Sequence, residues 1–379
     1  MKYTITAEDI KAYQKAIATT VGLKGERELR LSLTANNLQV TTTSGSTILH
    51  LNLVVSGSAD GEVWVDGLHL HKVSMLLPVG RELTVVGGDA LTYQLPGCTP
   101  LDIPLAATHP EVPSFQSGDL RSPSMGDGVQ VFEGVDLSGL NTRDKGPVNL
   151  SLKDYAVELY TRMSGNILRI QVPTAYKCPH PFATEVTHQT LFFMRKMKEA
   201  TISYYQGTGA AYMGLVDTVL GMEMLVPITE APSLEDMVSR LVALPTSYGV
   251  QVLQQDMLAA LRWCELGNPT AVSISYTDPH RYIEMVEAGS AKDPTKVPFT
   301  QEEGADDEES LVVKPLAVET ASYSPTALKD ALLALPKATI KMVGKLMPPD
   351  ADNNSSPPML SLSHTDSGTT IDVFISPLV

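Results

Sequence analysis

The residues in this sequence that are best suited to do chemistry are lysines and arginines in or beside short amphipathic segments. They are Lys11, Lys15, Lys24, Arg27, Lys72, Arg195, Lys196, Lys198, Arg262 and Lys329. Such side chains attract phosphate oxygens by charge, without reading a base sequence. If the helices that carry them share one surface, the pattern predicts sequence-independent binding of double-stranded DNA. The alternative is that these residues lie on ordinary solvated helix faces.

No motif for catalysis or metal binding fits its required context. GTGAAY at 207–212 has only two glycines of a dinucleotide fingerprint, and it falls in a predicted hairpin turn. DADNN at 350–354 begins like a calcium loop, but Ser355 replaces the turn glycine and Ser361 replaces the bidentate glutamate. We therefore expect no metal, no cofactor and no catalysis. An enzyme with dispersed active-site residues stays open as an alternative.

The composition predicts a soluble globular protein, with 43% hydrophobic and 19% charged residues. A net charge of −15 argues against binding nucleic acid over the whole surface, but it is compatible with an acidic exterior and one basic inner face. No apolar run reaches the roughly 20 residues of a membrane-spanning helix, so we expect a cytoplasmic protein without a membrane partner. The three cysteines, Cys98, Cys178 and Cys264, are predicted to be buried free thiols.

Internal repetition predicts the fold class. An amphipathic helix followed by two alternating strands occurs three times, with helices at 68–78, 189–200 and 325–337. Each copy follows another helix, at 6–20 (capped by Thr6), at 131–141 and at 254–266, the middle one weakened by two glycines. The pattern predicts an α+β protein with helices on one face of antiparallel sheets. We expect three domains, 1–117, 118–245 and 246–379, the last interrupted by an acidic surface loop at 289–310.

The sequence resembles the bacterial-type DNA polymerase sliding clamp, the beta clamp. GEVWVDGLHLHKVSMLLPVGRELTVVGGDALTYQL at 61–95 is similar to the second half of a clamp domain, and ELYTRMSGNILRI at 158–170 resembles a strand–turn–strand stretch of the family. YSPTALKDALLAL at 323–335 and IDVFISPLV at 371–379 resemble the final domain. The low identity and the acidic loop would suit a divergent or phage-encoded member.

The resemblance implies a head-to-tail ring of two chains that encircles duplex DNA near the replication machinery. Such a ring would tether a replicative polymerase and other DNA enzymes, and a clamp loader would place it on DNA. Helices would line the hole, and continuous sheets would form the outside. The alternative is a scaffold of the same fold that binds partner peptides without encircling DNA.

The resemblance also implies two contact sites. Partners of the family insert a short linear peptide between the middle and last domains; the matching residues are Met163, Gly165, Asn166, Ile167, Leu168, Pro245, Phe374 and Ser376. Asn166 and Ile167 replace the family's usual His-Arg, and Ser376 stands where Met is common, which puts the peptide preference in doubt. Ile167, Leu168 and Phe374 could instead be strand core residues. For the subunit interface, the matching residues are Leu101, Ile103, Trp263 and Cys264.

Overall fold

The computed structural model describes most of the chain in two compact units. It covers residues 1–22, 28–44, 47–110, 112, 129–130, 148–174, 177, 181–194, 200–206, 210–217, 219–229, 234–277, 282–299, 319–347 and 357–378. The first unit contains 1–134 and 189–229, and the second contains 135–188 and 230–379. The predicted helix at 131–141, five of the ten cations (Lys24, Arg27, Arg195, Lys196 and Lys198), Cys178 and the 300–310 part of the acidic loop lie outside the described residues.

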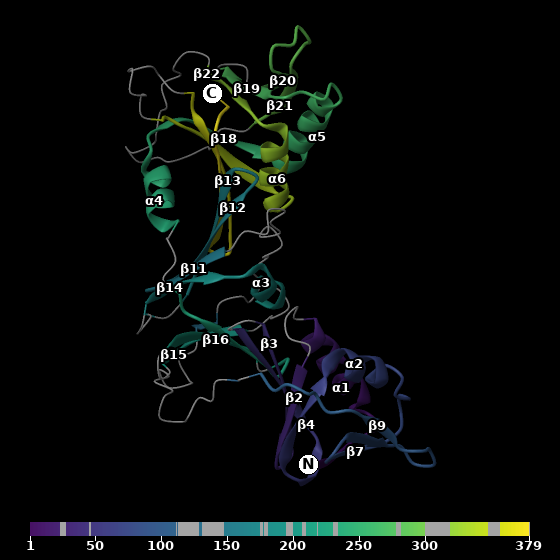
Figure 1. Ribbon diagram of the computed structural model, residues 1–379. Helices are drawn as coiled ribbons and strands as arrows, with labels where there is room; N and C mark the ends of the chain where they lie inside the picture. Colours follow the sequence, from purple (N-terminus) through teal and green to yellow (C-terminus); the bar gives the residue numbers. More distant parts are fainter. Residues whose placement is uncertain are drawn as a thin grey trace. The chain divides into compact units, whose positions relative to one another are not determined.

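The first unit contains two antiparallel sheets (Figure 1). One has five strands in the order β5 (Ser56–Ala59), β1 (Lys2–Ile5), β7 (Leu83–Gly87), β8 (Leu91–Gln94) and β9 (Leu101–Ile103). The other has eight, in the order β10 (Val129–Gln130), β15 (Ala200–Gln206), β16 (Ala211–Asp217), β17 (Met222–Pro227), β4 (Thr47–Val54), β3 (Asn37–Ser44), β2 (Glu28–Thr34) and β6 (Gly61–Asp66).

Two helices of the first unit pack against each other, α1 (Ile10–Val21) and α2 (Gly67–Ser74). The stripe Ile10, Tyr13 and Ile17 is buried, as its helical spacing predicts. The predicted Thr6 cap is wrong. Asp9 is the N-cap residue, and the Thr6 hydroxyl donates a hydrogen bond to the Asp9 carboxylate at 2.5 Å. A third helix, α3 (His188–Met194), begins at the boundary between the units.

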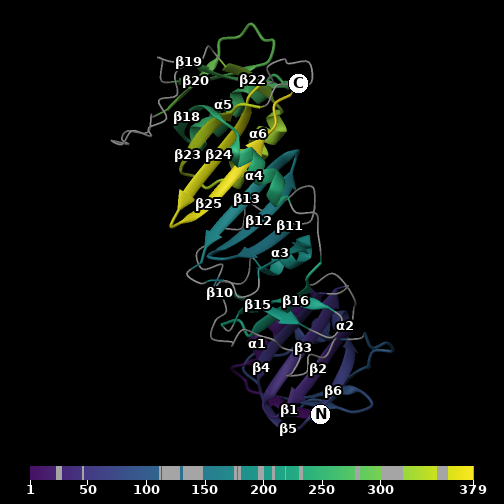
Figure 2. The same ribbon diagram turned by 90° about the vertical axis from the view of Figure 1, so that its left-hand side faces the viewer.

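The second unit also contains two antiparallel sheets (Figure 2). One has eight strands in the order β14 (Phe182–Val186), β11 (Val148–Lys153), β12 (Ala156–Met163), β13 (Asn166–Pro173), β25 (Thr369–Ile375), β24 (Met359–Asp366), β23 (Thr339–Lys345) and β18 (Thr246–Leu253). The other has four, in the order β21 (Thr295–Pro298), β20 (Tyr282–Glu287), β19 (Val272–Thr277) and β22 (Glu319–Tyr323).

Among the described residues, three helices flank the eight-stranded sheet of the second unit. The helices α5 (Gln254–Glu265) and α6 (Pro325–Ala334) pack together on one face, while α4 (Glu235–Ala243) lies on the other (Figure 1). The first two match predicted helices. Helix α4 was not predicted, although Leu234, Val238 and Leu241 have the i, i+4, i+7 spacing of an amphipathic helix.

Each eight-stranded sheet joins two of the repeated sequence blocks through one antiparallel pair of strands. In the first unit β17 pairs with β4, and Met224 lies opposite Leu49. In the second unit β25 pairs with β13, and Val373 lies opposite Leu168. All four of these apolar side chains are fully buried, because the pairing continues the sheet and its core across the boundary. We call these two strand pairs the internal junctions.

Candidate functional site

An apolar cluster lies at the internal junction of the second unit, on the sheet face that α4 covers. Ile167 of β13 and Phe374 of β25 lie directly opposite each other in the strand ladder. They pack with a larger set of side chains, which is Tyr160, Val238, Met359, Leu234, Leu241, Leu244 and Met347. Residues from the 158–170 stretch, from the end of the chain and from α4 therefore meet on one surface, which we call the α4 cluster.

Lys345 fixes the end of α4 over this cluster. Its ammonium donates to the carbonyl oxygens of Val242 and Leu244 at 3.0 and 3.1 Å, which are among the carbonyls that a helix end leaves without partners. The Leu346 amide donates to the carbonyl of Pro245 at 2.8 Å. Partial burial lowers the pKa of Lys345. Pro245 itself is exposed directly beyond the helix.

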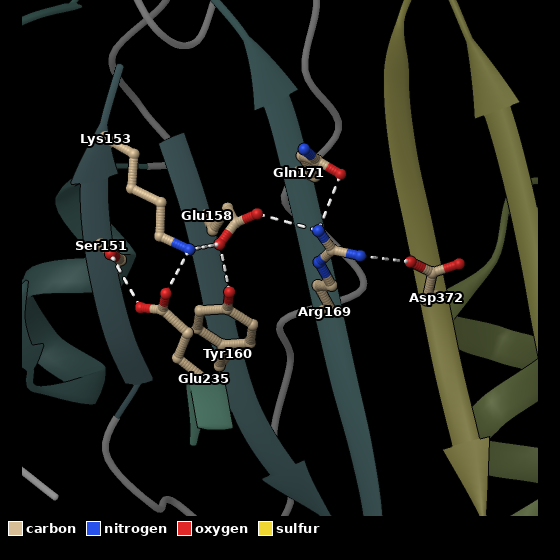
Figure 3. A network of polar contacts seen from close by, with 8 residues as sticks. All are labelled: Ser151, Lys153, Glu158, Tyr160, Arg169, Gln171, Glu235 and Asp372. Carbon is tan, nitrogen blue, oxygen red and sulfur yellow. Dashed lines mark hydrogen bonds and ion pairs between the residues drawn. The ribbon is translucent and has the colours of Figure 1, made fainter. Parts of the chain in front are cut away.

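A polar network continues the same sheet face beside the cluster (Figure 3). Lys153 lies 2.5 Å from Glu158 and 2.5 Å from Glu235, the first residue of α4. Arg169 lies 2.8 Å from Glu158 and 3.5 Å from Asp372. The Tyr160 hydroxyl also donates to Glu158, which connects the network to the apolar cluster. The network thus ties the start of α4 to the strands beneath it.

Burial and charge act in opposite directions on the two carboxyl groups of this network. Burial alone would raise the pKa of Glu158, but hydrogen bonds from Lys153, Tyr160 and Arg169 outweigh it and lower that pKa. Burial raises the pKa of Asp372 because Arg169 compensates it only in part. Glu158 is therefore the more firmly ionised of the two groups.

The structure separates the eight predicted peptide-pocket residues. Ile167 and Phe374 join the α4 cluster. Met163, Asn166 and Leu168 are buried on the opposite sheet face, where the Asn166 side chain donates to the Ala327 carbonyl of α6 at 2.7 Å. The remaining three, Gly165, Pro245 and Ser376, are exposed at segment ends. Tyr160, Met359 and the α4 residues were not predicted to belong to this site.

The described cations lie on two helix pairs. Lys11 and Lys15 on α1 and Lys72 on α2 are exposed in the first unit. In the second unit Arg262 on α5 is exposed. Lys329 on α6 lies 2.9 Å from Glu265 of α5, so a carboxylate already neutralises part of its charge. Lys15 and Arg262 are both exposed on helices, but they occupy different positions relative to the buried stripes of α1 and α5.

The predicted interface residues lie on an edge strand and on a helix. On β9 the Leu101 side chain is 47% exposed, whereas Ile103 is fully buried in the first unit. On α5 the Trp263 side chain is 68% exposed, whereas Cys264 is buried, as predicted. Cys98 is exposed, so its predicted burial is wrong.

The described residues contain neither a candidate metal site nor a candidate membrane-spanning helix. No group of three or more His, Cys, Asp or Glu side chains in these ranges is placed to hold a metal ion. No helix among them is long and apolar enough to cross a membrane.

Comparison with known proteins decides the fold. No protein-family model matches the sequence, and no curated protein matches it significantly. Solved structures match over 100% of both chains: the Helicobacter pylori beta clamp with diflunisal (10% identity, TM-score 0.72) and the Pseudomonas aeruginosa DNA polymerase sliding clamp with a ligand (11%, 0.69). The chain has the beta-clamp fold. The predicted α+β fold and the resemblance to a beta clamp are thereby confirmed.

The clamp fold also relates the chain to a peptide-bound structure. The Helicobacter pylori beta clamp bound to a DNA ligase peptide matches with 10% identity and a TM-score of 0.68, over 100% of both chains. The beta subunit of the Streptococcus pyogenes DNA polymerase matches with 12% identity and a TM-score of 0.69, again over both full chains.

Proposed function

We propose that this protein is a DNA sliding clamp: a ring around duplex DNA that tethers a replicative polymerase and other DNA enzymes and performs no catalysis. The observation that carries the proposal is the repetition of one kind of strand pairing at both internal junctions. The clamp fold and the exposed cations on repeated helices support it. The proposal includes the three domains 1–117, 118–245 and 246–379, a nucleoid-associated cytoplasmic location and placement on DNA by a clamp loader.

The internal junctions follow one rule. In the sheets, β2–β3–β4, β11–β12–β13 and β19–β20–β21 form three equivalent meanders. At both junctions the last strand of a later block, β17 or β25, pairs antiparallel with the third strand of the preceding meander, β4 or β13. The strand β9 is the last strand of the first block, and β21 is the third strand of the last meander. Each of them lies at one end of its sheet. Among the described residues, neither of them has a partner on its outer edge.

Pairing β9 of one copy with β21 of the next would extend the rule and leave no such edge exposed. Because the two strands are different surfaces of one chain, this contact is head to tail. A closed ring results when the rotations that relate each copy to the next add up to a full turn. We propose closure by two copies. Leu101 would then be buried, as Met222 and Ile371 are at the same place before the acidic residue of β17 and β25, and Trp263 would supply a further exposed apolar contact.

The charge distribution suits a ring that holds DNA by topology. Such a ring needs only weak, sequence-independent attraction to phosphates. We assign that role to the ten predicted cations, of which Lys11, Lys15, Lys72 and Arg262 are exposed on helices. The net charge of −15 would then lie mostly on the outside, where it limits adhesion of DNA to the wrong surface.

Tethering requires a partner site, which we place at the α4 cluster and the exposed residues around it. A partner held there by a short peptide is kept at high effective concentration near the DNA that the ring encloses. The Helicobacter pylori clamp that binds a DNA ligase peptide supports this mode of binding. The cluster combines apolar side chains with neighbouring charged ones, as small binding sites commonly do.

Retention on DNA tests the encirclement. Protein loaded with its loader onto a closed nicked circle should remain bound through gel filtration at high salt, because topology is insensitive to charge screening. Cutting the circle with a restriction enzyme should release it within minutes. Equal and rapid loss from the intact and the cut circle would contradict encirclement and favour a scaffold of the same fold that only binds partner peptides.

Substitution of Ile167 by aspartate tests the partner site. The new carboxylate would lie in the apolar α4 cluster, so affinity for a fluorescein-labelled DNA ligase peptide should fall at least about tenfold in fluorescence anisotropy. Leu333→Asp is the matched control, since Leu333 is 54% exposed on α6, on the other side of the sheet. Equal affinities of the Ile167 variant and the wild type would place the peptide elsewhere.

A further inference from the structure

The internal junction of the second unit places an acidic residue opposite a basic one. Asp372 of β25 lies opposite Arg169 of β13, and their side chains are 3.5 Å apart. The acid belongs to the last strand of a block and the base to the third strand of a meander. In the first unit Glu223 of β17 lies opposite His50 of β4, but burial lowers the pKa of His50 to about 4, so this junction has no cation at neutral pH.

The two free edge strands carry charges of the same polarity as the junction of the second unit. The segment 96–104, which contains β9, has one charged residue, Asp102, whereas the segment 290–299 around β21 has Lys292, Lys296 and Asp293. Asp102 is exposed and points away from the core, because its neighbour Ile103 on the strand is buried. Lys296 is likewise on the outer face, because its neighbour Val297 is buried.

Lys296 is only weakly engaged within its own chain. Its side chain is 57% exposed, and its ammonium lies 3.8 Å from Glu284 and 5.9 Å from the centre of the Tyr282 ring. Lys292 has a closer partner, Glu287, at 3.1 Å. The carboxylate of Asp102 accepts a hydrogen bond from Thr92 at 2.6 Å, which holds it on the outer face of the sheet edge. Lys296 is thus the cation most readily available to a second copy of the chain.

We propose that Asp102 of one copy faces Lys296 of the next, and that this charge pair selects head-to-tail pairing of the two edges. The inference rests on the proposed ring and specifies what recognises the second copy. Pairing of two β9 edges would bring two Asp102 carboxylates together, and pairing of two β21 edges would bring two Lys296 ammonium groups together. Like charges opposed across neighbouring strands destabilise the pairing, so both symmetrical alternatives are disfavoured.

Charge reversal with a mixing step tests the pair. Asp102→Lys and Lys296→Glu should each raise the dimer dissociation constant about tenfold in sedimentation equilibrium, since each ring contains two mismatched junctions. An equimolar mixture of the two variants should recover affinity close to that of the wild type. In a head-to-tail heterodimer one junction keeps the original pair and the other has the reversed pair, so both are complementary.

The controls separate charge pairing from misfolding and from failure of the ring itself. Asp89→Lys makes the same charge change at an exposed turn between β7 and β8 and should leave the dissociation constant unchanged. Recovery on mixing also shows that both variants are folded. Single variants that dimerise like the wild type, or a mixture no tighter than its components, would overturn the charge pair. A wild-type chain that stays monomeric would instead overturn the proposed ring, and the charge pair with it.

Discussion

Replacing Arg169 by methionine should lower the free energy of unfolding by about 3–5 kcal/mol at pH 7, as expected when one partner of a buried ion pair is removed. The Arg169 side chain is 17% exposed and lies between Glu158, at 5%, and Asp372, at 14%. Methionine would keep much of the packing volume but leave both carboxylates without this cation. Urea denaturation of the full chain, followed by circular dichroism, would measure the loss.

The pH dependence distinguishes lost charge compensation from lost packing. In the wild type the lowered pKa of Glu158 contributes stability above the unfolded pKa, which is lost as pH falls through the folded value. Without Arg169 the pKa of both carboxyl groups should rise, so protonation relieves the buried charge and the deficit should shrink toward pH 4. Arg162→Met, at an exposed position on β12, should cost no more than about 0.5 kcal/mol. A deficit that is constant with pH would indicate a packing effect.

Replacing Leu101 by aspartate should raise the dissociation constant of the proposed dimer about a thousandfold. Leu101 is 47% exposed in the single chain, and its counterparts at the internal junctions, Met222 and Ile371, are buried. A central apolar contact of an interface typically contributes about 2 kcal/mol, and a two-copy ring contains the junction twice, which gives about 4 kcal/mol. Sedimentation equilibrium would measure the dissociation constant, and retention on closed circular DNA should fall with it.

A matched substitution controls for the added charge. Val54 is 83% exposed at the end of β4, in the same unit as Leu101, and Val54→Asp should leave the dissociation constant close to the wild-type value. If Leu101→Asp also dimerises like the wild type, β9 is not the edge through which the copies meet. The melting temperature of each variant should be measured at a protein concentration below the dissociation constant. It would then show whether the single chain still folds.

The sequence predicted the repeated architecture because its signals are local. The helical stripe of Ile10, Tyr13 and Ile17 and the alternation of the strands are short-range patterns, and the structure has helices and strands there. The helix start at Asp9 was missed because Thr and Asp are both common N-cap residues, and the sequence does not show that the Thr6 hydroxyl donates to the Asp9 carboxylate.

The site was harder to predict because it depends on which face of a sheet each residue occupies. The stretch from Met163 to Leu168 is continuous in sequence, but strand alternation puts Ile167 on the α4 face and Leu168 on the helix α6 side. Lys329 could not be recognised as partly neutralised, because Glu265 is 64 residues away in the chain. Burial of these residues likewise depends on long-range pairing, such as that between β13 and β25.

The unequal lengths of the strand ladders predict where the proposed ring would yield under force. The internal junctions are ladders of four and five paired residues within continuous eight-stranded sheets, and the chain connects their two sides covalently. The strands left for the contact between copies are shorter, with three residues in β9 and four in β21. A loader that pulls the ring apart would therefore separate the copies at these strands before it tears either long sheet. Opening and reclosing would then leave each chain's own core intact.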